Sequence, residues 1–364
     1  MVNKKIGTLL LTGMMVMSMG TSAFAADVHT ITGTPGNSAK VSVTKDLEFA
    51  EGITIPSTAF SFKAELKPES PDAPVATISK ISYSNADDKG ALNTVGKYVV
   101  SKNSEINFEK FPHAGEYLYT VSEETGNVEG MSYSTTTYTL RVYVVNDDNG
   151  NLYVKNITAQ EDGTENKPEK VLFTNTYTKR GGENSGENSD SLVIRKETKG
   201  ELADKTKKFK FDVYFKKAAT TPATDKELIG KIGQDTITFK YGETTRVELS
   251  DEQELRFAEI PAGTRYTVTE VGEVDDYTPS VKVIENGNEQ KERGAGDGDD
   301  LCSAENNSTN LIGEYENKVT FVNTYKNLVV TGIIAKNAPL ILVAGLGVVA
   351  MLGYSLLKRK FVKR

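Results

Sequence analysis

A lysine, a glutamate and an asparagine recur at nearly the same spacing in the two halves of this 364-residue sequence. Lysine and glutamate are 78 residues apart in the first half and 74 in the second, and glutamate and asparagine are 52 and then 53 apart. A lysine amine and an asparagine side chain can condense to an isopeptide bond with loss of ammonia, while a carboxyl group moves the proton. The two sets are Lys45, Glu123 and Asn175, and Lys196, Glu270 and Asn323.

The sequence around these polar residues places them in a hydrophobic core. Each one ends a stretch in which every second residue is apolar, as Lys45 follows Val43 and Val41. Alternate residues of a strand share a face, so all six polar side chains are predicted to point inward. Burying an unpaired charge is very costly, so two matched sets require a chemical reason.

We therefore predict one isopeptide bond within each set. In an apolar core the pKa of lysine falls and that of glutamate rises, which makes a neutral amine available as the nucleophile. Protonated Glu123 and Glu270 are predicted to hydrogen-bond to the asparagine carbonyl oxygen and to shuttle protons to the leaving ammonia. Each site would react once, so the chain is not predicted to be an enzyme. The alternative is a buried salt bridge of Lys45 to Glu123 and of Lys196 to Glu270, with the asparagine of each set as a hydrogen-bonding neighbour.

The body of the chain is predicted to be all-β and duplicated. Short alternating apolar stretches are separated by turn signals, as where residues 138–145 and 152–157 flank the polar loop 146–150. Segments with helical periodicity are absent. Three strand signatures recur on each side of a polar, glycine-rich stretch. We interpret residues 26–179 and 191–327 as two domains and residues 180–190 as a linker.

The first 25 residues are interpreted as a secretory signal peptide. Lys4 and Lys5 are followed by a mostly apolar run, and a small residue at Ala25 marks a cleavage site before Ala26. A membrane anchor is the alternative, but the apolar run is short for a bilayer.

The C-terminal segment, residues 328–364, contains a second targeting signal. Residues 338–357 are uncharged and largely apolar, enough for a helix of about 30 Å across a bilayer, and a basic tail follows. The order of motif, span and tail resembles the cell-wall sorting signal of Gram-positive surface proteins, which a sortase cuts between Thr331 and Gly332. An ordinary membrane anchor is the alternative. The motif is Leu328-Val329-Val330-Thr331-Gly332, with valine where the usual pattern has proline at its second position.

Composition excludes several other classes of protein. Removing the 2 positive charges of the first 25 residues and the 6 of the last 33 from the formal charge of −7 leaves −15 for residues 26–331. Such an acidic body does not suit nucleic-acid binding, which needs clustered lysine and arginine. One cysteine and two histidines predict no disulfide and no metal site. No cofactor is predicted.

Together, the two sets of residues, the signal peptide and the sorting signal resemble the major (backbone) pilins of Gram-positive sortase-assembled pili, of the streptococcal T-antigen type. The resemblance implies two tandem immunoglobulin-like (CnaB-type) β-sandwich domains. It also implies that each domain is closed by one bond between its first and last strands, Lys45–Asn175 and Lys196–Asn323. The implied product is a cell-surface shaft subunit, held in the membrane until it is anchored to the cell wall.

The same resemblance implies a lysine that accepts the threonine carboxyl of the next subunit. Lys170 and Lys167, just before the last strand of the first domain, are the candidates, with Lys170 placed first. The implied partners are copies of the chain, a sortase, minor pilins, peptidoglycan and a host surface. A sortase-anchored adhesin or a minor pilin, basal or at the tip, is the alternative function.

Overall fold

The computed structural model describes residues 30–186, 189–272, 276–296 and 298–326. The predicted signal peptide with its Ala25–Ala26 cleavage site, the sorting motif at 328–332 and the apolar span at 338–357 lie outside the described residues. Within the described ranges no helix is long and apolar enough to cross a bilayer. The only helix there is the short 3-10 helix η1 (Glu183–Ser185), so the prediction of an all-β body is confirmed for the described residues.

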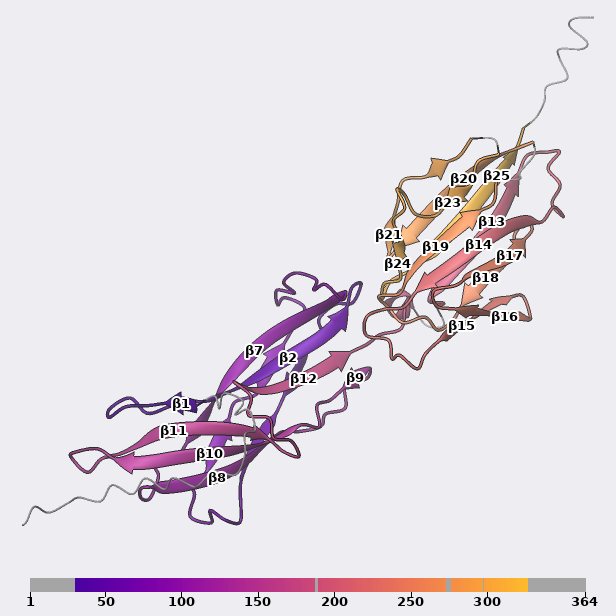
Figure 1. The fold of residues 1–364 in the computed structure, drawn as a ribbon. Coiled ribbons are helices and arrows are strands. Elements are labelled where there is room, and N and C mark those ends of the chain that lie inside the picture. Colours follow the sequence, from indigo (N-terminus) through magenta and orange to yellow (C-terminus); the bar gives the residue numbers. More distant parts are fainter. Residues whose placement is uncertain (1–29, 187–188, 273–275, 297, 327–364) are drawn as a thin grey trace, which may run out of the picture.

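The first domain packs two five-stranded sheets against each other (Figure 1). One sheet has the order β1-β11-β10-β8-β4, with bounds Thr30–Thr32, Leu152–Glu161, Thr137–Asn146, Gly115–Glu123 and Phe62–Leu66. The other has the order β5-β7-β2-β12-β9, with bounds Ala76–Ile78, Lys97–Phe108, Ser42–Ala50, Val171–Tyr177 and Met131–Ser132. A small pair, β3 (Thr58–Phe60) and β6 (Ile81–Tyr83), completes the domain.

The second domain repeats the sandwich with more unequal sheets. The larger sheet has the order β16-β15-β18-β13-β25-β20-β21, with β22 also on β20; the bounds are Asp235–Lys240, Glu227–Ile232, Glu254–Phe257, Leu192–Lys199, Lys318–Tyr325, Tyr277–Glu285, Asn288–Glu289 and Arg293–Gly294. The smaller sheet has the order β17-β14-β19-β23, with β24 also on β19; the bounds are Thr244–Leu249, Phe209–Lys216, Arg265–Glu270, Leu301–Cys302 and Asn310–Leu311.

In both domains the first long strand and the last strand are neighbours that run parallel. β2 pairs with β12 in the first domain, and β13 pairs with β25 in the second. Each of these four strands alternates buried and more exposed residues over most of its length. Each domain has its own core of buried aliphatic and aromatic side chains, which lies between its sheets.

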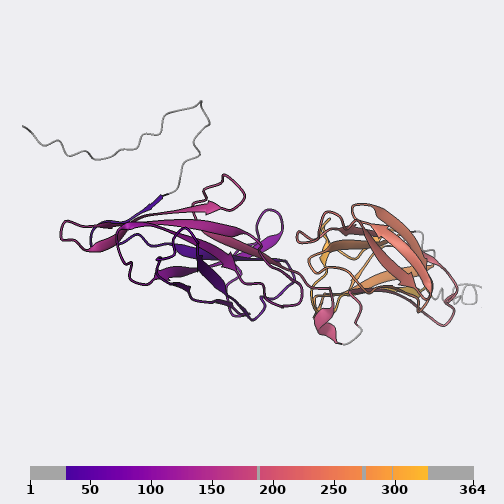
Figure 2. The same ribbon diagram turned by 90° about the horizontal axis from the view of Figure 1, so that it is seen from below.

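The two domains lie end to end (Figure 2) and meet at a hydrogen-bonded joint. Glu314 of the second domain is fully buried there, and its Oε1 accepts a hydrogen bond of 3.2 Å from the Thr54 N–H of the first. The Glu314 N–H donates to the Gly52 carbonyl over 3.1 Å, and its carboxylate lies 3.4 Å from Lys179 Nζ. Arg265 and Glu51 form an ion pair across the same joint.

Part of the predicted linker is fixed against the second domain. The Gly181 N–H donates to the carbonyl of Ile260 over 2.7 Å, and the Asn184 N–H donates to the Glu314 carbonyl over 2.7 Å. A glycine is needed at 182, because its φ is +70° and a Cβ there would lie 2.4 Å from the Asp190 carbonyl oxygen. Residues 180–186 therefore follow one defined path across the joint.

Candidate functional site

The parallel strand pair of each domain places lysine and asparagine side by side. On β2 and β12, Lys45 lies opposite Phe173 and Asn175 lies opposite Leu47, so the two polar residues are offset by two positions on one face. On β13 and β25 the register repeats, with Lys196 opposite Phe321 and Asn323 opposite Thr198. The glutamates come from the facing sheets, at the ends of β8 and β19.

In the first domain the carboxylate of Glu123 bridges the other two groups. Its Oε2 accepts a hydrogen bond of 2.7 Å from Lys45 Nζ, and its Oε1 accepts one of 2.6 Å from Asn175 Nδ2. The side chains of Lys45 and Glu123 are fully buried, as is Asn175. The predicted nucleophile, proton carrier and acceptor are therefore brought together, although they are 78 and 52 residues apart in sequence.

The second domain repeats the arrangement with fewer hydrogen bonds. Glu270 Oε1 accepts a hydrogen bond of 2.7 Å from Asn323 Nδ2 and lies 3.3 Å from Lys196 Nζ. Glu270 Oε2 and Asn323 Oδ1 are buried and have no hydrogen-bond partner among the described residues. An unsatisfied buried polar atom costs free energy, so the second set is less well satisfied by hydrogen bonds than the first.

Burial shifts the acid–base balance in the direction that the chemistry needs. It lowers the pKa of Lys45 to about 8, against the opposing effect of the hydrogen bond and charge of Glu123. Burial likewise lowers the pKa of Lys196 to about 8, against the charge of Glu270. Burial also raises the pKa of Glu270. A neutral amine is therefore far more accessible in these cores than on a surface lysine.

The orientation of both asparagines differs from the sequence-based expectation. Glu123 and Glu270 were expected to contact the carbonyl oxygen, but each receives a hydrogen bond from the amide nitrogen instead. In the first domain the reason is visible, because the Ser134 N–H donates to Asn175 Oδ1 over 2.7 Å. A backbone N–H can only donate, so this contact makes Oδ1 the acceptor and leaves Nδ2 facing Glu123.

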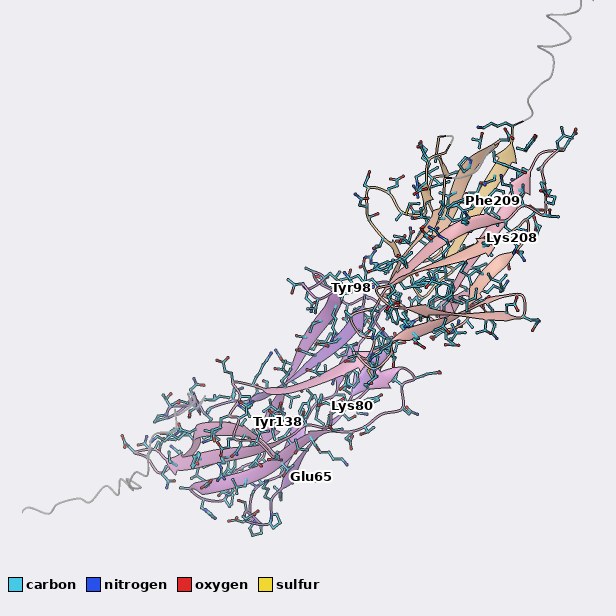
Figure 3. All side chains as sticks on the ribbon, turned by 45° about the vertical axis from the view of Figure 1, so that its right-hand side comes forward. Glu65, Lys80, Tyr98, Tyr138, Lys208 and Phe209 are labelled. Carbon is cyan, nitrogen blue, oxygen red and sulfur yellow. The ribbon has the colours of Figure 1, made fainter. Side chains whose placement is uncertain are left out.

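Sequence reasoning missed two aromatic residues that cover the buried amines. Lys45 Nζ lies 4.6 Å from the ring centroid of Phe60. Lys196 Nζ lies 4.2 Å from that of Phe209, which is labelled in the second domain in Figure 3. A repeated Phe-x-Phe pattern in the sequence could have revealed these two residues, because Phe62 follows Phe60 and Phe211 follows Phe209. The second phenylalanine of each pattern lies opposite the glutamate of its set across the sheet.

The two candidate polymerisation lysines lie away from this buried site. Lys167 and Lys170 are exposed in the loop between β11 and β12. Neither ammonium group forms an ion pair or a side-chain hydrogen bond with the described part of the chain. Both are therefore sterically open to another molecule, as are other surface lysines.

Comparison with known proteins finds matches to both domains. A family described as "Spy0128-like isopeptide containing domain" matches residues 41–178, which hold the complete first set. A domain of unknown function, DUF7601, matches residues 190–325, which hold the second. A curated protein named "Pilin" from Streptococcus pyogenes serotype M1 is 30% identical over 372 residues, covering 96% of this chain and 97% of its own length.

The chain belongs to the pilin family. Among solved structures, the major pilin of Streptococcus pyogenes is 25% identical and covers 80% of this chain and 99% of its own, with a TM-score of 0.37. The major pilin T3.2 of the same species is 24% identical and covers 79% and 98%, with a TM-score of 0.36. Membership of this family identifies the chain as a subunit of a cell-surface pilus.

Proposed function

We propose that this pilin is a shaft subunit whose two domains each close themselves with a lysine–asparagine isopeptide bond. The observation that carries the proposal is the pair of buried Lys–Glu–Asn sets, built on the same strand register in both domains. A buried salt bridge with asparagine as a hydrogen-bonding neighbour would show the same contacts, and what favours the bond is the repetition of all three residues in both domains.

The bond exchange follows from the contacts of the first set. Lys45 Nζ attacks Cγ of Asn175, so that the Nζ–Cγ bond forms and the Cγ–Nδ2 bond breaks. As the amine attacks, it gives one proton to the carboxylate of Glu123, and the carboxyl group then delivers that proton to the leaving nitrogen, so that Glu123 ends in the protonation state in which it began. Both groups already contact this carboxylate. One ammonia leaves, and the fold supplies the proximity that the reaction needs.

The position of the bonds suits a fibre under tension. Each bond joins the first long strand of a domain to its last, and these strands are direct neighbours in one sheet. Force applied at the chain ends passes into these strands, and the covalent link prevents them from separating. The residues between the two cross-linked positions are then shielded from extension.

Assembly is proposed to use the sorting signal. A sortase cuts between Thr331 and Gly332 and joins the threonine carboxyl to Lys170 or Lys167 of another copy. The precursor is held in the membrane during this step, and the finished polymer is attached to peptidoglycan with minor pilins. Residues 167 and 170 support the role only by their exposure and their place before β12.

A denaturing gel of cell-wall extracts tests assembly. Wild-type chain is expected to give a ladder of high-mass bands, and a variant with both Lys167→Ala and Lys170→Ala is expected to give monomer. Lys155→Ala, which removes another exposed lysine of the same domain, is the matched control and keeps the ladder. An unchanged ladder in the double variant refutes the assignment of the lysine, and the absence of any ladder in wild type refutes the shaft function.

A further inference from the structure

The two asparagine carbonyl oxygens differ in a way that the proposed reaction makes important. Asn175 Oδ1 accepts a hydrogen bond of 2.7 Å from the Ser134 N–H. Asn323 Oδ1 is buried and has no hydrogen-bond donor among the described residues. Attack by the amine places negative charge on this oxygen, so a donor here stabilises the transition state more than the starting state.

The difference arises from the path of one strand. In the first domain β9 pairs with β12 only through Ser132 and Met131, and the chain then crosses to the facing sheet, where β10 begins at Thr137. Ser134 lies in this crossing, outside any strand, and its N–H is free to turn toward Asn175.

In the second domain the corresponding strand does not cross. β20 stays paired with β25 from Tyr277 to Ile284, which places Pro279 opposite Asn323 and Ser280 opposite Val322. Pro279 has no N–H to donate, and Ser280 is held opposite Val322 in the strand ladder. Because Tyr277 pairs with the final tyrosine of its domain as Met131 does, Ser280 is the counterpart of Ser134.

We propose that the backbone N–H of Ser134 is an oxyanion donor for the first cross-link, and that the second cross-link forms without such a donor from the described residues. The N–H also holds the amide so that Nδ2, the leaving nitrogen, faces Glu123. The bond exchange remains balanced, because the Ser134 N–H only donates a hydrogen bond and neither gains nor loses a proton. The inference rests on the proposed isopeptide bond and adds a catalytic group to it.

The test removes this single N–H from the full chain. The chain is synthesised in a cell-free system with mild detergent, with serine 134 replaced by its α-hydroxy acid, so that an ester oxygen stands in place of the N–H. Synthesis is stopped, samples are digested over time, and both cross-linked peptides are quantified by mass spectrometry. Ser134→Pro is the genetic counterpart, and Ser134→Ala, which keeps the N–H, is the matched control.

The ester is expected to slow formation of the Lys45–Asn175 bond about 100-fold or more, the usual effect of losing one oxyanion donor. The Lys196–Asn323 bond in the same molecules should form at its wild-type rate, as should both bonds in Ser134→Ala. Protease resistance of the first domain verifies that it is folded.

Two other results have distinct meanings. A folded ester variant that forms the first bond within about threefold of the wild-type rate overturns the role of Ser134, because an oxyanion donor is worth far more. Absence of both bonds in wild-type chain overturns the proposed function itself.

Discussion

At the scale of single residues, burial in the core lowers the pKa of the two lysines and so favours their reactive neutral form. The alternation of apolar residues was enough to predict that Lys45 and Glu123 face the core, because strand periodicity fixes the face. It could not predict the Ser134 N–H, since a backbone donor leaves no trace in residue type. Nor could it predict which way the Asn175 amide turns, which depends on that donor.

The role of the glutamate is tested by a neighbouring pair. Glu123→Ala removes the carboxylate that contacts both reacting groups, and it should leave the first domain one ammonia heavier than the wild type. Glu124→Ala removes a half-exposed carboxylate that pairs with Lys63 on the surface, and it should change nothing. Peptide mapping locates the bond, and a cross-linked first domain in Glu123→Ala would contradict the assigned role.

The buried amine also predicts a pH dependence in a variant that cannot react. In Asn175→Ala, Lys45 has a pKa of about 8 when folded, since burial persists, and 10.5 when unfolded. Between these pKa values the folded state binds fewer protons than the unfolded state. Burial of Lys45 therefore destabilises the folded state fully below pH 8, and this cost disappears as the pH rises toward 10.5. The free energy of unfolding should therefore rise by about 3 kcal/mol over this range.

Urea unfolding at several pH values measures this rise. The matched control is Asn175→Ala combined with Lys45→Met, which keeps every other titrating group and should lack the rise. Equal pH dependence in the two variants would show that burial does not perturb the lysine.

At the scale of elements, the decisive feature is the parallel pairing of first and last strands. The repeated strand signatures predicted that these strands exist and match, and the structure places them side by side in both domains. The sequence did not reveal that the chain after Ser132 changes sheets while β20 stays with β25. Both segments have strand-like patterns, and only the packing of the complete sandwich decides which sheet each one joins.

This difference predicts an order of reaction in the wild-type chain. The first domain has an oxyanion donor and a closer Lys–Glu contact, 2.7 Å against 3.3 Å, so its bond should accumulate first. Time-resolved peptide mapping after synthesis measures how fast the Lys45–Asn175 and Lys196–Asn323 bonds accumulate. A second-domain bond that forms earlier would contradict this order and the advantage of the Ser134 donor.

At the scale of the whole molecule, the joint determines whether two domains behave as one rod. Composition predicted a glycine-rich linker at 180–190, but it could not show that Glu314 is buried against the first domain, because the contact joins residues 260 positions apart. The hydrogen bonds of residues 181 and 184 to the second domain further restrict the hinge. The targeting segments remain predictions from sequence.

Glu314→Ala tests the stiffness of the joint. It removes the acceptor of the Thr54 N–H, a hydrogen bond worth about 1 kcal/mol, and one of the partners of Lys179. Small-angle scattering should report a broader distribution of interdomain angles. Glu316→Ala, an exposed neighbour, is the control and should match the wild type. An unchanged distribution in Glu314→Ala would mean that the other contacts alone hold the joint.

The central claim is that each domain carries a covalent lysine–asparagine bond, and the intact mass of residues 26–331 tests it most directly. The account predicts a mass lower than that of the sequence by two ammonias, with linked peptides joining Lys45 to Asn175 and Lys196 to Asn323. A mass equal to that of the sequence would contradict it, and both sets would then be buried salt bridges.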